Sequence, residues 1–173
     1  MSITLFHLGP GAAIKALIPQ YFSLTVFTLV QFIIDAEVVY LYFVKSEVTH
    51  RYLHSYAGAS AVVLFCVIFG KHIAQLWLKL WNKLIAPGRH SRLYINDSVG
   101  FKSVLYAAIF GAYFHIFIDS LIYSDMQPLY PWSSENGLYG TVNMVALHFT
   151  LLVLGTIGIF WLLIHTLTNK FKN

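Results

Sequence analysis

Residues 107–132 read AAIFGAYFHIFIDSLIYSDMQPLYPW, and this largely apolar run carries His115 and Asp119 four residues apart. On an α-helix, this spacing puts an imidazole and a carboxylate on one face, about one turn from each other. An ionisable group at membrane depth is costly unless it is paired, hydrated or bound to a cation. Two interpretations are therefore open: a structural His–Asp hydrogen bond that anchors the helix to a neighbour, or part of a functional site.

Composition predicts a membrane protein. Of the 173 residues, 58% are hydrophobic and 10% are charged, with a mean hydropathy of +0.68. Soluble domains carry about 25% charged residues, so this chain is suited to lipid. We expect a single all-α domain over residues 1–173, built as a polytopic membrane bundle of about four long transmembrane helices plus a short N-terminal half-helix.

Long apolar runs predict the spanning helices, over residues 21–44, 57–84, 101–123 and 138–167. A shorter helix over residues 12–17 is stopped at Ile18-Pro19, because a residue before proline is disfavoured in the helical region. It is too short to cross a bilayer, so we expect a half-span or re-entrant arm. The chain start has neither a basic region nor a small-residue cleavage site, and we expect no removed signal peptide.

Further ionisable side chains are predicted at the depth of His115 and Asp119. Asp35 and Glu37 interrupt the apolar run 21–44, but their spacing of two cannot place both on one helix face. A helical hairpin that turns near Pro19 would return Asp35 to the height of His7, since a helix rises about 1.5 Å per residue.

The segment 49–55 is predicted to open the next helix. On that helix His50 and His54 would be four apart, the spacing that presents two imidazoles to one ion. Arg51 could clamp a phosphate or carboxylate, or could instead anchor the helix end at lipid headgroups. His148 lies near the same face, and its role as a ligand stays open.

Imidazoles and carboxylates in roughly equal number suit a divalent metal, zinc first, with Mn²⁺ and Fe²⁺ as competitors. More than four ligands suggest two or more ions, and such sites typically perform hydrolysis. The candidate catalytic residues are Asp119, His54 and Arg51. The predicted metal ligands are His7, Asp35, Glu37, His50, His54, His115 and Asp119, where Glu37 is either a ligand or the support of a ligand.

Four motifs follow one another along the chain: Asp35-x-Glu37, His50-Arg51-x-x-His54-Ser55, His115-x-x-x-Asp119 and Pro128-Leu129-Tyr130-Pro131-Trp132-Ser133. Their order resembles the YdjM-like, LexA-regulated family of inner-membrane metal-dependent hydrolases, which show PD-x-D, HR-x-x-THS, H-x-x-x-D and PL-x-P-[FW]-S. The likeness covers most of the chain from His7 to Ser133. It implies a membrane-embedded hydrolase in the bacterial inner membrane.

The chain departs from that family at three positions. Ile34 replaces the proline before Asp35, Glu37 replaces the second aspartate, and Leu53 stands where the family has threonine. More distantly, the order of histidines and aspartates is similar to the zinc sites of phospholipase C and single-strand nucleases. That likeness implies phosphoester chemistry on a lipid or lipid-linked substrate, as an analogy at the level of the fold.

The charge distribution predicts the orientation. The connection over residues 70–102 carries six Lys or Arg residues and the C-terminal tail adds two lysines, whereas residues 123–138 carry none. The positive-inside rule places the basic connection and the C-terminus in the cytoplasm and the site on the opposite side. Because the basic residues are scattered at membrane ends, we expect no nucleic-acid binding.

The leading hypothesis is therefore a hydrolase, and two others stay open. One is a non-enzymatic membrane protein with a structural His/Asp metal site or hydrogen-bond network. The other is a metal or proton transporter, because intramembrane histidines and aspartates also form relays. Transport would need polar residues that continue into the cytoplasmic half, which offers few besides Gln31, His72 and His165.

Overall fold

The chain folds into five helices, and no strand occurs in the described part of the chain. The computed structural model describes residues 6–86, 91 and 93–170, with backbone only for 166–170. The helices are α1 (Leu8–Leu17), α2 (Leu24–Phe43), α3 (Tyr56–Leu84), α4 (Phe101–Ile122) and α5 (Met144–Lys170). The predicted all-α class is confirmed, and so is a short first helix, which begins at Leu8 and not at residue 12.

Four of these helices are long and apolar enough to cross a membrane: Leu24–Phe43, Tyr56–Leu84, Phe101–Ile122 and Met144–His165. Much of their apolar surface faces outward. On α5, for example, the side chains of Val145 and Phe149 are exposed by 75% and 66%. Such exposure would be costly in water but is expected for helices whose outer faces contact lipid.

One predicted element is wrong. Residues 49–55 do not open a helix, because α3 begins only at Tyr56. Ser55 is the N-cap, and its side chain accepts a hydrogen bond from the backbone N–H of Gly58 at 3.0 Å. A serine at this position satisfies an N–H group that has no partner inside the helix. His50 and His54 therefore lie in the loop before α3 and not on one helix face.

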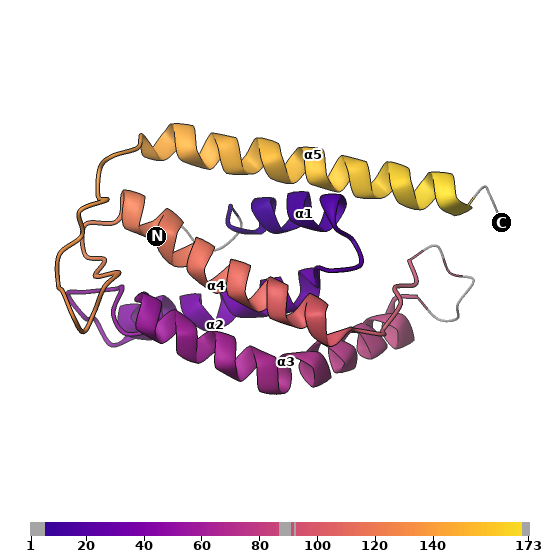
Figure 1. Ribbon diagram of the computed structural model, residues 1–173, viewed down its shortest axis with the longest axis horizontal. Coiled ribbons are helices and arrows are strands. Elements are labelled where there is room, and N and C mark those ends of the chain that lie inside the picture. The colour runs from indigo at the N-terminus through magenta and orange to yellow at the C-terminus, as the bar shows by residue number, and fades with distance from the viewer. Residues whose placement is uncertain (1–5, 87–90, 92, 171–173) are drawn as a thin grey trace.

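The core lies between α2, α3 and α4, where Phe27, Val30 and Ile116 are almost completely buried. Figure 1 shows α1 between α5 and the other helices. A Cβ added to Gly155 of α5 would lie 2.7 Å from Cα of Gly9 in α1. The two helices can therefore pack this closely because both positions lack a side chain.

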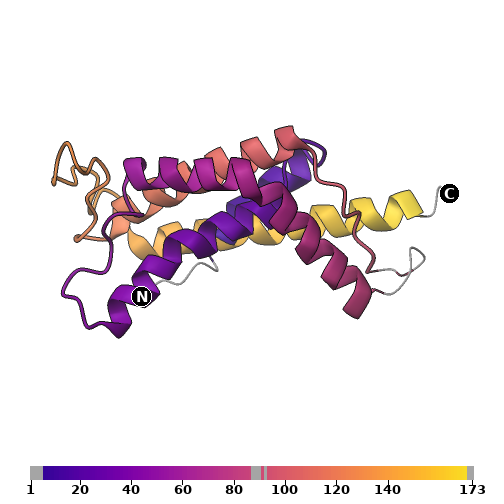
Figure 2. The ribbon, with the colours of Figure 1, turned by 90° about the horizontal axis from the view of Figure 1, so that it is seen from below.

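The bundle has two chemically different ends. The loops 45–55 and 123–143 lie at one end, together with the start of α5 (Figure 1). The end of α3, the start of α4 and the end of α5 lie at the other, which carries the basic connection. Figure 2 shows in addition that α3 changes direction partway along its length, so that its second half diverges from α4.

Candidate metal centre

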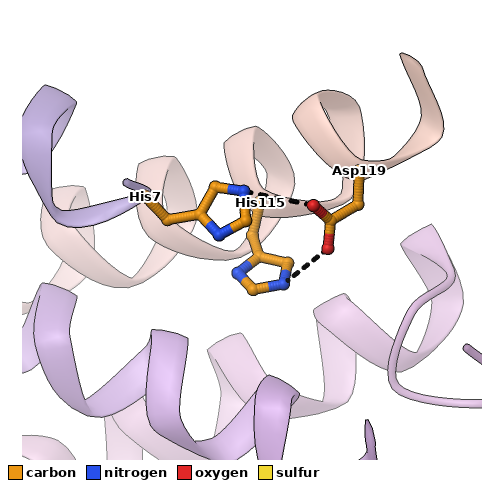
Figure 3. Close-up of side chains that lie close together, drawn as sticks. All are labelled: His7, His115 and Asp119. Atoms are coloured by element: carbon orange, nitrogen blue, oxygen red, sulfur yellow. Dashed lines mark ion pairs between the residues drawn. The ribbon is translucent and has the colours of Figure 1, made fainter. Parts of the chain in front are cut away.

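Asp119, on the last turns of α4, lies at the centre of the site, and its side chain is 3% exposed. Its Oδ1 atom lies 3.1 Å from Nε2 of His7, which immediately precedes α1. Its Oδ2 atom lies 3.1 Å from Nε2 of His115, one turn earlier on α4. Figure 3 shows the two imidazoles pointing at the two oxygens of this carboxylate.

Asp35 from α2 and His54 from the loop before α3 complete the cluster. Oδ1 of Asp35 lies 3.5 Å from Nε2 of His115 and 4.0 Å from Nε2 of His54. Nε2 of His54 lies 3.8 Å from Oδ2 of Asp119. The cluster thus joins α1, α2, α4 and the loop 45–55, segments far apart in sequence.

Three overlapping groups of buried side chains have ligand atoms within 4.8 Å of one another: His7 with His115 and Asp119, Asp35 with His54 and His115, and His50 with His54 and Asp119. Ligands about 2.0–2.1 Å from one tetrahedral zinc ion lie about 3.3 Å apart. The spacings in the cluster, 3.1 to 4.0 Å, bracket this value. These groups could hold a metal ion.

Several of these polar atoms are buried without a hydrogen-bond partner in the described part of the chain. They are both ring nitrogens of His7, Nε2 of His54, Nε2 of His115, Oδ2 of Asp35 and Oδ1 of Asp119. A buried polar atom without a partner is destabilising, and native proteins rarely leave one. A cation bound among these atoms would satisfy them, so the donor set fits a divalent metal.

Two histidines of the cluster are held in place through their other ring nitrogen. Nδ1 of His115 lies 2.7 Å from Oε1 of Gln31, whose amide nitrogen donates to the backbone oxygen of Gly111. Nδ1 of His54 lies 3.0 Å from Oε2 of Glu37. Because both oxygens accept, each Nδ1 carries the hydrogen and each Nε2 keeps a lone pair toward the cluster, as in metal-binding histidines.

Glu37 therefore contacts the site indirectly. It is absent from the three groups, and its carboxylate accepts hydrogen bonds from the backbone N–H groups of residues 51–54. Asp35 and Glu37 point to different surroundings because two residues on a regular helix are about 200° apart. Of the two roles that the sequence allowed for Glu37, ligand or support of a ligand, this geometry favours support.

Asp125 is a site residue that the sequence reasoning missed. Its Oδ1 atom lies 2.9 Å from Nδ1 of His50, and its Oδ2 atom accepts from the backbone N–H groups of Thr49 and His50 and from the Thr49 hydroxyl. It thus orients His50 as Glu37 orients His54. The one signal in the sequence was a carboxylate shortly after Asp119, in a loop without Lys or Arg.

Two further candidates lie outside the three groups. The Arg51 side chain is exposed, with its guanidinium carbon 6.0 Å from the centre of the Tyr52 ring. The ring of His148 packs against Phe6, with 4.6 Å between the ring centroids. Neither side chain contributes a ligand atom to the groups that could hold metal.

Three ionisable residues of the site lie outside the four long helices, and their surroundings shift their pKa values in different directions. Burial lowers the pKa of His7, but the charge of Asp119, the contact with its carboxylate and the charge of Asp35 together raise the pKa above its usual value. Burial, together with the nearby His54, lowers the pKa of His50. Burial tends to raise the pKa of Asp125, but hydrogen bonds from Thr49 and His50 hold it below its usual range. His50 is therefore favoured in the neutral form that a metal ligand requires.

Fold and site together define a helical protein with four helices suited to crossing a membrane and buried His/Asp groups that could hold metal. No family model, curated protein or solved structure matches this chain. Its function must therefore be inferred from its own residues.

Proposed function

We propose that this chain is a membrane-embedded, metal-dependent hydrolase that acts on a phosphoester in a lipid or lipid-linked substrate. The observation that carries the proposal is the cluster of buried imidazole nitrogens and carboxylate oxygens that lie within ion-pair distance of one another, several of them without a hydrogen-bond partner among the described residues. Asp119 belongs to two of the three groups, and its two oxygens face different histidines. This arrangement supports more than one bound ion, with zinc as the first choice.

The proposed ligands are His7, Asp35, His50, His54, His115 and Asp119. Divalent ions bound there would lower the pKa of a bound water to about 7 and stabilise negative charge on a phosphoryl oxygen. The residues of the chain hold these ions in place and exclude bulk water. Asp119 balances positive charge at the centre, and His54 presents Nε2 beside both aspartates.

Arg51 and the aromatic loop residues fit a lipid substrate. The exposed Arg51 follows His50 directly, so its guanidinium can meet a phosphate that approaches from the bundle end. Tyr52 packs near Tyr130, with ring centroids 6.0 Å apart, and Trp132 is 79% exposed. Aromatic side chains of this kind gather at the membrane interface, where a lipid phosphoester would lie.

The hypothesis of a metal or proton transporter has less support. On the side away from Asp119, Nδ1 of His115 contacts the side-chain oxygen of Gln31. The side-chain nitrogen of Gln31 donates to the backbone oxygen of Gly111. Next to Gln31, the core toward the other end of the bundle is apolar, with Val26, Phe27 and Val30 each at most 1% exposed. A relay for ions or protons would need polar groups in this layer.

The test is elemental analysis of the purified protein together with hydrolysis of a phosphatidylcholine dispersion and of a soluble phosphodiester, before and after chelation. We expect bound divalent metal, hydrolysis, and loss of both on chelation. Metal without hydrolysis of either substrate would favour a structural metal site. Absence of metal at full stability would favour a network of His–Asp ion pairs, and either outcome would reject the proposal.

A further inference from the structure

A cavity of about 920 Å³ lies at the end of the bundle opposite the metal centre. It is open on one side and is lined by the end of α1 and the turn after it, the first half of α2, the second half of α3, the chain that leads into α4, and Leu162 of α5. Figure 1 places these segments together, away from the loops that carry His50 and Asp125. None of the candidate metal ligands lines this cavity, so it requires a separate explanation.

Lys15 is the one charged side chain among the described residues that line the cavity. Its ammonium group donates to the backbone oxygens of Pro19 and Phe22. An ammonium group has three hydrogens, so one remains for a ligand. Burial lowers the pKa of Lys15, and an anion bound in the cavity would offset that effect. The wall therefore offers one partly buried cation and no carboxylate among its described residues.

The polarity of the wall changes along α2. Thr25, Thr28, Leu29 and Phe32 lie at helical spacing on one face and all line the cavity. The hydroxyl groups come first, near the end that Lys15 contacts through Phe22, and the apolar side chains follow deeper along the helix. A ligand that matches this order has a polar, anionic group at one end and a hydrocarbon chain at the other.

The apolar part of the cavity is continuous with the outer surface of the bundle. Phe32 on α2 and Trp77 on α3 line the cavity and are also 60% and 63% exposed. A hydrocarbon chain could therefore leave the cavity between α2 and α3 and enter the surrounding lipid. Trp77 also fits the membrane interface, where tryptophan is enriched.

We propose that this cavity is a binding site for one anionic membrane phospholipid, with its phosphate at Lys15 and an acyl chain along α2. Its volume falls within the range of ordinary ligand pockets. The site is separate from the metal centre and does not depend on the proposed hydrolase activity. In the orientation predicted from the basic connection, it faces the cytoplasmic leaflet, which is rich in anionic lipids.

The proposal is tested by binding of dioleoylphosphatidylglycerol to the purified protein in detergent, measured by native mass spectrometry. Dioleoylphosphatidylcholine and inorganic phosphate are the comparison ligands. We expect phosphatidylglycerol to bind as a single molecule, about tenfold more tightly than phosphatidylcholine, with no retention of inorganic phosphate. Equal affinity for both lipids would reject the role of Lys15, and equal binding of inorganic phosphate would reject the role of the apolar wall.

Variants locate the binding site. Lys15→Gln should reduce phosphatidylglycerol affinity about tenfold, whereas Lys15→Arg should preserve it. Lys79→Gln is the matched control, because it removes the same charge from an exposed part of α3 outside the cavity. If Lys15→Gln does not fold, Thr28→Trp provides the test by filling the cavity from α2. Full lipid binding by Thr28→Trp with unchanged metal content would overturn the proposal.

Discussion

The carboxylate of Glu37 lies 3.0 Å from Nδ1 of His54 and also accepts hydrogen bonds from the four consecutive backbone N–H groups of residues 51–54. One side chain on α2 therefore fixes both the path of the loop and the orientation of the imidazole that it carries. His54 in turn presents Nε2 to Asp35 and Asp119. A partly buried carboxylate that lies outside the three groups can thus determine the geometry of the site.

Glu37→Ala is predicted to destabilise the protein strongly. It leaves several backbone N–H groups without an acceptor, each at a cost of about 1–3 kcal/mol where the group stays buried. Glu37→Gln keeps one acceptor oxygen and should be intermediate. Thermal unfolding of the metal-free protein measures the effect, and Glu47→Gln, an exposed glutamate of the same loop, is the control. Equal unfolding temperatures for Glu37→Ala and the control would contradict the supporting role.

Asp125→Ala is predicted to weaken metal binding about 10–100-fold, the range found when a partner of a metal-binding histidine is removed. His50 would keep its position in the chain but lose the acceptor at Nδ1. Titration of the metal-free protein with Zn²⁺ measures the change. Glu135→Ala removes an exposed carboxylate from the same loop and should bind Zn²⁺ as the wild type does. A normal affinity in Asp125→Ala would contradict the role of Asp125 in orienting His50.

Much of the fold follows from the sequence because hydrophobic runs long enough to span a bilayer are a strong signal. The i,i+4 spacing of His115 and Asp119 likewise identified two side chains that the structure brings to 3.1 Å. The same spacing gave a wrong prediction for His50 and His54, which lie in the loop before α3 and not on a helix. There the Ser55 cap and the acceptor Glu37 determine the backbone, and both act through contacts that periodicity does not reveal.

For a similar reason, the sequence could not predict that Asp125 is the partner of His50. Asp125 reaches it from the loop after α4, and sequence spacing says nothing about which loops meet at one end of a bundle. The contact between His7 and Asp119 was predictable only in part. The helical hairpin predicted near Pro19 placed His7 and Asp35 at the same depth in the membrane. Which side chains His7 meets at that depth depends on the close packing of α1 against α5.

Gly158→Ala tests that packing. Alanine is favoured over glycine within a helix by about 1 kcal/mol, so local propensity predicts stabilisation. The added Cβ would lie 2.5 Å from the backbone nitrogen of Ala13, and the resulting overpacking should instead destabilise by about 1–3 kcal/mol. Gly137→Ala is the control, since its added Cβ meets no atom within 4 Å. A higher unfolding temperature for Gly158→Ala would contradict the close approach of α1 and α5.

The orientation can be tested by cysteine labelling in intact cells. In a Cys66→Ala background, Ser134→Cys lies in the loop beside the metal centre and Ser91→Cys lies in the basic connection. The positive-inside rule predicts that a membrane-impermeant maleimide labels Ser134→Cys from outside and Ser91→Cys only after lysis. Labelling of both positions from one side would reject the predicted topology.

Asp119→Asn is predicted to abolish hydrolysis while the protein stays folded. Asparagine keeps the shape and one acceptor oxygen, but it removes the negative charge that lies between His7 and His115. Without that charge, bound cations lose their central counter-ion, so metal content should fall together with activity. Asp97→Asn makes the same change in a loop at the other end of the bundle and should leave both properties unchanged.

Metal content and thermal unfolding, measured on the same preparations, separate this role from a purely structural one. If Asp119 only paired with the two histidines, asparagine could still hydrogen-bond to one of them, and His115→Ala would be the more damaging variant. His115→Ala would then leave Gln31 without its partner, at a cost of about 1–3 kcal/mol for the buried amide. Full metal occupancy and wild-type unfolding in Asp119→Asn would remove the central residue from the proposed hydrolase, because the negative charge that lies between both nearest histidines would then contribute nothing to metal binding.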